Sequence, residues 1–222
     1  MASVSSSTDL DSMSDHDLYS KIIRYTSLPQ YVNTIASQFV RDVMKNRPYV
    51  TFHWRFDNSD WMSSCRHNRA PTPRRKLCSF ILSLKPPHIA NAILLGLTEV
   101  NDVILKDVTT NDVISDVYIA TPPSQYGVME ELEKLLRVSQ NITMHYGIHM
   151  RRYVIQNFPH CDWLLPNLND VLSNSEMTVC VKSHTFYRAT SSSWSTNVVL
   201  SRPRSKFNPR ILDLLRTANH TS

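Results

Sequence analysis

Apolar and polar positions follow two periods along this chain, one typical of helices and one typical of buried strands. From residue 29 to 46, apolar residues recur at helical spacing and form one stripe, which predicts an amphipathic helix. Pro48 cannot continue that helix. The nearly continuous apolar run over residues 49–56 then predicts a buried strand. This step from helix to strand is the repeating unit of parallel sheets.

The remaining elements follow from the same patterns and from the prolines and turn residues that bound them. Ser124 is placed to cap a helix, and residues 57–76 read as a loop. The predicted helices are 87–97, 125–138, 168–181, 193–200 and 207–216, and the predicted strands are 116–121, 142–148 and 185–187. The alternation predicts an α/β fold, a Rossmann-like and mostly parallel sheet with helices on both faces.

Length and composition fit one domain. The chain has 222 residues, of which 41% are hydrophobic, enough for a sizeable core. Residues 1–17 are polar and are predicted to be a disordered lead-in, with a single domain over 18–222. The start lacks the basic and apolar regions of a secretory signal, and no apolar run reaches the length of a membrane span. A complete chain would therefore be cytoplasmic.

The net charge is +5, and part of the excess is local. A basic cluster comprises Arg66, Arg69, Arg74, Arg75 and Lys76. Nucleic-acid binding, a nucleotide-diphosphate site and a solvated basic loop each account for such a cluster. The cluster contains no aromatic residue on which a base could stack, which argues against single-stranded nucleic acid.

The four cysteines, Cys65, Cys78, Cys161 and Cys180, have no pair at the spacing of a zinc knuckle. We therefore expect no metal. Cys65 and Cys78 flank the basic, proline-containing loop, where a disulfide would tie the loop down. Free buried thiols are the alternative, and the residues alone leave both open.

His53 and Arg55 stand at the end of the first predicted strand. They are two residues apart, so an extended chain points both to the same side. In open α/β sheets, ligands bind at the carboxyl ends of the strands. A guanidinium beside a histidine at that place suits a phosphate-bearing ligand. The alternative is an ordinary strand with a solvated polar end.

Several segments together resemble the GDP-fucose protein O-fucosyltransferase superfamily, and most closely its divergent nematode-like branch. They are His53-Trp54-Arg55, Asp60-Trp61 leading to Cys65, the strand at 116–121, and His184-Thr185-Phe186 leading into Ser192-Ser193-Trp194. The resemblance extends over residues 22–202. It implies the C-terminal, donor-binding half of a GT-B glycosyltransferase, because enzymes of that arrangement have two Rossmann-like halves.

The resemblance also implies roles for the first part of the site. Arg55 would hold the diphosphate of GDP-fucose and stabilise the charge that develops as GDP leaves, which makes it the expected catalytic residue. His53 would contact the nucleotide or orient Arg55. No metal or other cofactor is implied.

The later motif residues would complete the donor site. By resemblance, Ser192 and Ser193 grip the pyrophosphate at a helix start, and Trp194 packs near the nucleotide. Without the resemblance, this segment reads as a serine-rich turn. Glu176 falls where the family has a carboxylate that accepts hydrogen bonds from guanine. A solvated helix residue is the alternative for Glu176.

The implied function is transfer of fucose from GDP-fucose to Ser or Thr of a protein acceptor, in the lumen of the endoplasmic reticulum. The sequence departs from the family at Ala120-Thr121-Pro122, where a carboxylate is lost. It also holds one half of the two-half arrangement, so that a partner chain would supply the other. A non-catalytic GDP-sugar-binding or regulatory protein is therefore the first alternative, and a basic nucleic-acid-binding module is the second.

Overall fold

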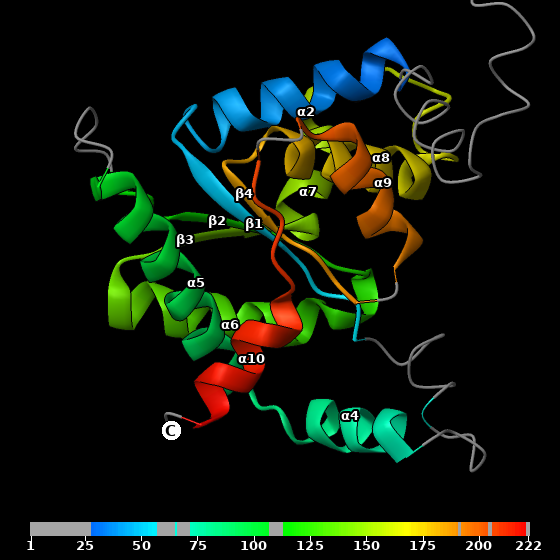
Figure 1. Cartoon of the computed structure of the whole chain (residues 1–222). Helices are drawn as coiled ribbons and strands as arrows, with labels where there is room; N and C mark the ends of the chain where they lie inside the picture. The colour runs from blue at the N-terminus through cyan, green and yellow to red at the C-terminus, as the bar shows by residue number, and fades with distance from the viewer. Residues whose placement is uncertain are drawn as a thin grey trace, which may run out of the picture.

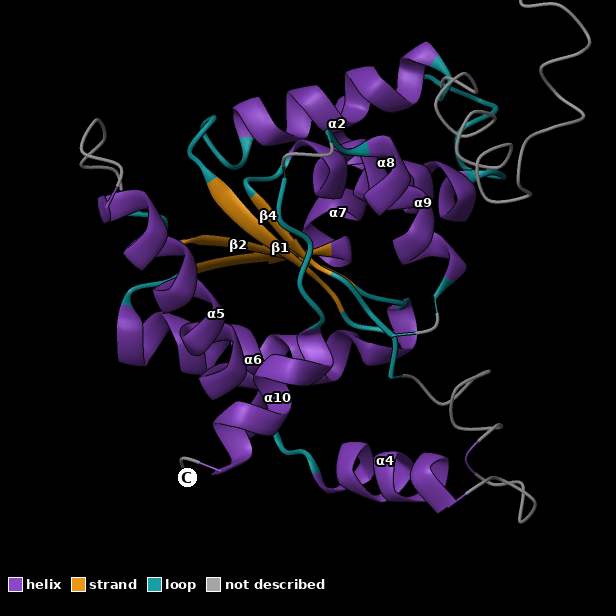
Figure 2. Ribbon diagram, viewed as in Figure 1, coloured by secondary structure: helices purple, strands orange, loops and turns teal. Residues whose placement is uncertain are grey.

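The computed structural model describes residues 28–56, 65, 72–106, 113–190, 192–203 and 206–220. The strands of this part of the chain are β1 (Tyr49–His53), β2 (Asp116–Ala120), β3 (Thr143–Tyr146) and β4 (Thr185–Tyr187). They form one parallel sheet in the order β3-β2-β1-β4 (Figures 1 and 2). The predicted α/β fold with a parallel sheet is confirmed.

Helices cover both faces of the sheet (Figure 2). One face packs against α5 (Pro86–Lys106), α6 (Tyr126–Gln140) and α10 (Ile211–His220), with α4 (Thr72–Ser83) at the periphery. The other face packs against α2 (Gln30–Asp42), α7 (Gly147–Asn157), α8 (Leu168–Lys182) and α9 (Ser193–Ser201). This coverage explains why the strands lack an apolar-polar alternation, since neither face meets solvent.

Side chains of β1 divide between two hydrophobic cores. Val50 and Phe52 point into the core under α5, α6 and α10, whereas Tyr49 points into the core under α2, α7 and α8. His53 shares the parity of Tyr49 and therefore faces the α8 and α9 side. The two-residue period of the strand therefore places the His53 side chain on the α8 and α9 side of the sheet, at the carboxyl end of β1.

The strand order places a topological switch point beside β1. The chain steps outward from β1 to β2 and β3 through α5 and α6 on one face, and then returns through α7 and α8 on the other face to β4. Connections in opposite directions run over opposite faces because parallel crossovers are right-handed. The carboxyl ends of β1 and β4 therefore diverge into helices on different sides, which is where open α/β sheets form ligand crevices.

Two predicted elements at the start of the domain extend beyond their observed ends. The helix predicted to run to residue 46 ends at Asp42, because Lys45 and Asn46 adopt left-handed backbone conformations with φ of 59° and 53°. The strand predicted over 49–56 ends at His53, where its ladder with β2 finishes opposite Ala120. Arg55 therefore lies in the loop just beyond β1.

Three predictions of local structure were wrong. The predicted loop over 57–76 overlaps α4, which begins at Thr72, and the predicted strand over 142–148 ends at Tyr146 because α7 begins at Gly147. A short 3₁₀ helix, η2 (Pro123–Gln125), contains Ser124, so that Ser124 does not cap α6. In each case, a new helix starts inside a short segment that the sequence pattern assigned to another structure.

The boundaries of two further helices also differ from the prediction. The helix predicted over 87–97 extends to Lys106 as α5. The terminal helix starts at Ile211 rather than at 207, because the backbone of residues 209–211 pairs with Arg188: Arg188 N–H donates to Pro209 O at 2.8 Å, and Ile211 N–H donates to Arg188 O at 3.1 Å. This segment lies beside the chain that leaves β4.

The structure decides between the two cysteine alternatives. Cys65 and Cys78 form a disulfide, which links residue 65 to α4, while Cys161 and Cys180 are free thiols. Among the described residues, α5 is the one helix with the length and apolar composition to cross a membrane, a test that core helices also pass. The predicted lead-in, residues 1–17, lies outside the described residues.

Candidate functional site

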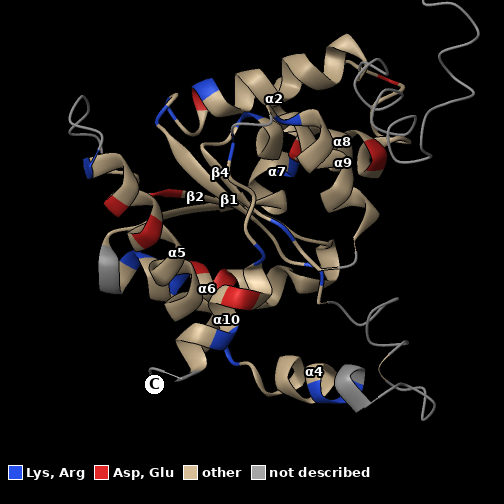
Figure 3. Cartoon of the chain, viewed as in Figure 1, with Lys and Arg blue, Asp and Glu red and all other residues tan. Residues whose placement is uncertain are grey.

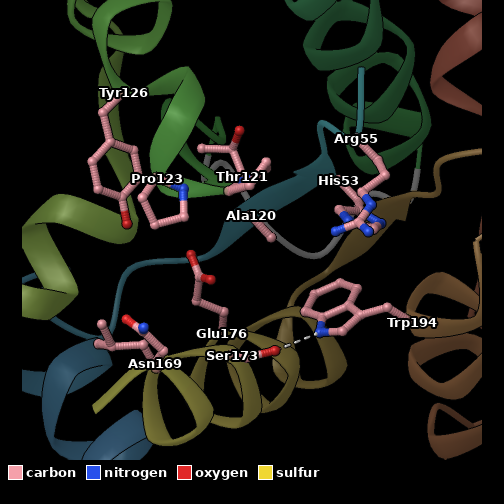
Figure 4. Close-up of a pocket in the computed structure, with 12 residues that line it drawn as sticks. His53, Arg55, Ala120, Thr121, Pro123, Tyr126, Asn169, Ser173, Glu176 and Trp194 are labelled. Carbon is pink, nitrogen blue, oxygen red and sulfur yellow. Dashed lines mark hydrogen bonds between the residues drawn. The ribbon is translucent and has the colours of Figure 1, made fainter. Parts of the chain in front are cut away.

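A cavity of about 310 Å³ opens at the carboxyl ends of β1 and β2, beside the switch point. Its wall is built by the ends of these two strands, by η2 and the start of α6, and by one face of α8 with Trp194 of α9 (Figure 4). The lining residues are His53, Arg55, Ala120, Thr121, Pro122, Pro123, Tyr126, Asn169, Leu172, Ser173, Glu176 and Trp194. Four of the six predicted site residues are among them.

His53 and Arg55 lie together at one end of this cavity (Figure 4). His53 is buried, and its Nδ1 is 2.7 Å from Ser195 Oγ of α9. Burial and the neighbouring Arg55 guanidinium lower the pKa of His53 to about 3. His53 is therefore neutral at physiological pH, and Arg55 supplies the positive charge at this end of the cavity.

The Ser192-Ser193-Trp194 segment begins α9, as predicted. Ser192 is the N-cap residue, and its Oγ accepts a hydrogen bond from Ser195 N–H at 3.2 Å. Ser193 is exposed at the first turn, and neither serine lines the cavity. Trp194 does line it, with its ring centroid 4.4 Å from that of His53 and its Nε1–H donating to Ser173 Oγ at 3.3 Å (Figure 4).

Glu176 extends from α8 toward the middle of the cavity, between Tyr126 and Trp194 (Figure 4). Its carboxyl group is buried, and its Oε1 accepts a 2.8 Å hydrogen bond from the hydroxyl of Tyr118. Burial raises the pKa of Glu176 to about 8, and the Tyr118 hydrogen bond lowers it in part. The alternative reading of Glu176 as a solvated helix residue is therefore wrong.

Tyr126 and Gly147 both lie next to Glu176. A Cβ on Gly147 would lie 2.3 Å from the Tyr126 hydroxyl and 3.0 Å from Glu176 Oε1. Glycine at this first residue of α7 thus lets the phenol and the carboxyl group approach the helix start. Burial and Glu176 together raise the pKa of Tyr126, so its hydroxyl keeps its proton.

We expect Gly147→Ala to destabilise the protein by about 1–3 kcal/mol, because the new methyl group overlaps Tyr126 and Glu176. Urea denaturation measures the change. Gly127→Ala is the matched control, since nothing lies within 4 Å of a Cβ there, and we expect it to be neutral or to stabilise α6 by up to about 1 kcal/mol. Equal effects of the two substitutions would refute the proposed close approach at Gly147.

Sequence reasoning missed several residues that build this site. Tyr126, Asn169 and Ser173 line the cavity, while Tyr118 and Ser195 hold Glu176 and His53 from behind. One signal was available: Tyr126 follows the double proline after β2, in the first turn of a helix that starts at the carboxyl edge of the sheet. Nothing local marks the other residues, since each acts through a contact with a distant segment.

Two further features of the described residues concern metal ligands and charge. Among them, no group of three or more His, Cys, Asp or Glu side chains is arranged to hold a metal ion. Lys and Arg positions are interspersed with Asp and Glu over several helices in the view of Figure 3. Of the predicted basic cluster, the side chains of Arg75 and Lys76 are described and are exposed on α4, the backbone of Arg74 belongs to the same helix, and Arg66 and Arg69 lie outside the described residues.

A scan against protein-family models found no match, and neither did a search of curated proteins. Two solved structures are similar to this chain, both crystal structures of POFUT1 in complex with GDP. The crystal-form-III structure has 17% sequence identity and a TM-score of 0.47, covering 88% of this chain and 50% of that chain. The high-resolution structure has 16% identity and a TM-score of 0.48, covering 89% and 51%.

The chain thus spans about half the length of the solved structures it matches. POFUT1 is a protein O-fucosyltransferase, the family that the sequence motifs resemble.

Proposed function

We propose that this cavity binds the nucleoside diphosphate of a GDP-sugar, with GDP-fucose as the donor. The observation that carries the proposal is the separation of two chemistries within one cavity. Arg55 provides a cation at one end, and the buried carboxyl group of Glu176 faces the middle. A nucleoside diphosphate has a matching order of groups, because the ribose separates its base from its anionic diphosphate.

The cation at the Arg55 end suits the diphosphate. A guanidinium donates hydrogen bonds to phosphate oxygens in bidentate geometry. Trp194, in the first turn of α9, lines the cavity near Arg55, so the N-terminus of α9 is close to this end. Helix N-termini favour anions. When a glycosyl phosphate bond breaks, negative charge grows on the diphosphate, and a fixed cation stabilises that charge.

The surroundings of Glu176 suit a guanine base. An ionised carboxylate accepts two hydrogen bonds side by side, and guanine offers a pair of adjacent N–H donors on one edge. Tyr126 and Trp194 stand on either side of Glu176 (Figure 4), so a planar base meets aromatic surface as well. The resemblance of the motifs to protein O-fucosyltransferases favours fucose as the sugar and Ser or Thr of a protein as the acceptor.

Donor binding without transfer is the second candidate function. Of the described residues that line the cavity, Glu176 is the one carboxylate, and the Tyr118 hydroxyl donates a hydrogen bond to it. Where the resembled family has a further carboxylate, this chain has Pro122. Among the described lining residues, no second carboxylate is present to accept the proton of the attacking hydroxyl, and the low pKa of His53 makes it a weak base.

We expect Arg55→Ala to weaken the binding of GDP and GDP-fucose at least tenfold, because it removes charge-assisted hydrogen bonds to the diphosphate. Isothermal titration calorimetry with GDP, GDP-fucose and ADP measures this directly. Arg137→Ala, an exposed position on α6 outside the cavity, is the matched control and should bind like the wild type.

Two results separate the candidate functions. Release of GDP from GDP-fucose together with fucose attached to the protein acceptor, both abolished by Arg55→Ala, would establish transfer. Binding without GDP release would identify a donor-binding protein. A folded wild-type chain that binds neither nucleotide would overturn the proposal as a whole.

A further inference from the structure

Ser195 links two segments behind the cavity. Its Oγ accepts a hydrogen bond from Ala189 N–H at 3.1 Å and lies 2.7 Å from His53 Nδ1. Both Ser195 and His53 are buried. The hydroxyl therefore joins the chain after β4, the first turn of α9 and the end of β1 at one point.

The hydrogen bonds at Ser195 determine which ring nitrogen of His53 carries its proton. A serine hydroxyl has one hydrogen to donate. If His53 Nδ1–H donated to Ser195, the oxygen would accept two N–H groups and its own hydrogen would face no acceptor among the described residues. A buried donor without a partner is unfavourable. If Ser195 instead donates its hydrogen to an unprotonated Nδ1, the Ser195 hydroxyl, the Ala189 N–H and the Nδ1 atom all have hydrogen-bond partners.

We propose that Ser195 is a positioning residue that holds His53 as the neutral tautomer with its proton on Nε2, so that His53 presents an N–H donor to the anionic part of the ligand. The anionic ligand rests on the function proposed above, whereas the tautomer does not. In a neutral imidazole, the bond made by one nitrogen fixes the state of the other. His53 therefore acts neither as a cation nor as a proton acceptor in this cavity.

The surroundings of His53 agree with this assignment. Trp194 lies against its ring at 4.4 Å between centroids and restricts its rotation. Burial and Arg55 keep the pKa of His53 far below neutrality, which removes the imidazolium form. Within the described residues, Nδ1 makes the one hydrogen bond of this ring, which leaves Nε2 as the nitrogen for a ligand. A bare Nε2 would repel a phosphate oxygen, and Nε2–H attracts it.

The tautomer is measured by two-bond ¹H–¹⁵N correlation NMR on protein with labelled histidine and no nucleotide, at pH 7. The chain has nine histidines, so His53→Gln assigns the signal. We expect the Nε2–H pattern in the wild type, a mixture of tautomers in Ser195→Ala, and the wild-type pattern again in Ser195→Thr, which keeps the hydroxyl. An Nδ1–H or imidazolium pattern in the wild type would overturn the proposal.

Ser192→Ala controls for disturbance of the helix. It removes the N-cap of the same α9 but leaves the contact between Ser195 and His53 intact. We expect it to lower the melting temperature and leave the His53 signal unchanged. A change in the His53 tautomer equal to that in Ser195→Ala would mean that helix packing and not the hydroxyl sets the tautomer, which would also overturn the proposal.

Titration with GDP then tests the role toward the ligand. We expect Ser195→Ala to weaken GDP binding about three- to tenfold and Ser195→Thr to restore it. Unchanged affinity in Ser195→Ala, despite a changed tautomer, would overturn the donor role of His53. Absence of GDP binding in the wild type would instead refute the proposed function, and the tautomer measured without nucleotide would stand apart from that result.

Discussion

Replacing Arg202 with leucine is expected to destabilise the fold by about 3–5 kcal/mol. Arg202 follows α9 and is buried, with 3% of its surface exposed. Its Nη1 donates to Cys180 O at 2.6 Å, to Val181 O at 3.1 Å, and to Ser183 O and Oγ at 3.1 and 2.9 Å. Its Nη2 donates to His184 O at 2.9 Å. Leucine fills much of the volume but donates nothing.

The physical reason is that most of these acceptors are carbonyl groups at the C-terminal end of α8. The last carbonyls of a helix have no partner within the helix, and the negative end of the helix dipole lies there. Arg202 satisfies several of them with one rigid, permanently charged group. Without it, buried carbonyls at the junction of α8 and β4 lose their donor, and each unsatisfied group is costly. The same junction orients α8, which carries Glu176.

Urea denaturation of three variants measures the effect. Arg202→Lys should fall between wild type and Arg202→Leu, because an ammonium group keeps the charge but cannot donate in the same planar fork. Arg216→Leu, exposed on α10, is the matched control and should change the free energy of unfolding by less than about 0.5 kcal/mol. A loss below about 1 kcal/mol in Arg202→Leu would show that water replaces the guanidinium.

The layered fold could be predicted because its strands and long helices carry strong patterns. Buried strands such as 116–120 read as short apolar runs between turn signals, and the stripe of α2 repeats over several turns. Helix α7 was missed because Gly147 directly follows β3, so strand and helix share one apolar run. The end of α2 was misplaced because the left-handed conformations of Lys45 and Asn46 leave no mark in an apolar pattern.

The site could be predicted only where a local rule applied. His53 and Arg55 stand two apart at the end of a strand, and the switch-point rule places ligands there. The partners of the site residues follow no such rule. Tyr118 and Glu176 are 58 residues apart, and His53 and Ser195 are 142 apart. Their meeting depends on how α8 and α9 pack on the sheet, which is a property of the whole fold.

The affinity for GDP is expected to rise about 50-fold from pH 6 to pH 8, because Glu176 must ionise to bind guanine. The pKa of its carboxyl group is raised to about 8 by burial. With that pKa, about 1% of the group is ionised at pH 6 and about half at pH 8. A protonated carboxyl group carries a hydrogen on one oxygen, and that oxygen then meets an N–H donor of the base with a donor of its own. The protonated form therefore does not pair with guanine.

Other titrating groups can be separated from Glu176. The pKa of His53 is lowered to about 3, so His53 does not change charge between pH 6 and 8. The terminal phosphate of GDP does ionise in this range, near pH 6. Isothermal titration calorimetry should therefore compare wild type with Glu176→Gln at each pH. The ratio of their dissociation constants removes the phosphate contribution, and this ratio should carry the 50-fold change.

Tyr118→Phe gives the sharpest test of the assignment. The Tyr118 hydroxyl donates to Glu176 Oε1 and thereby lowers the pKa of the carboxyl group. Its removal should shift the rise in GDP affinity to higher pH without flattening it, whereas Glu176→Gln should flatten it. A Tyr118→Phe profile that coincides with that of the wild type would contradict the role of this pair.

The same proton also has a consequence in the absence of nucleotide. A folded-state pKa near 8 lies above the ordinary value of 4.5, so between these values the native protein holds a proton that the unfolded chain has released. Stability from this group is complete below about pH 4.5 and is lost as pH rises through 8, by about 1.4 kcal/mol per pH unit. Wild-type melting temperature should fall over this range relative to Glu176→Gln. A difference between the two proteins that stays constant with pH would locate the proton elsewhere.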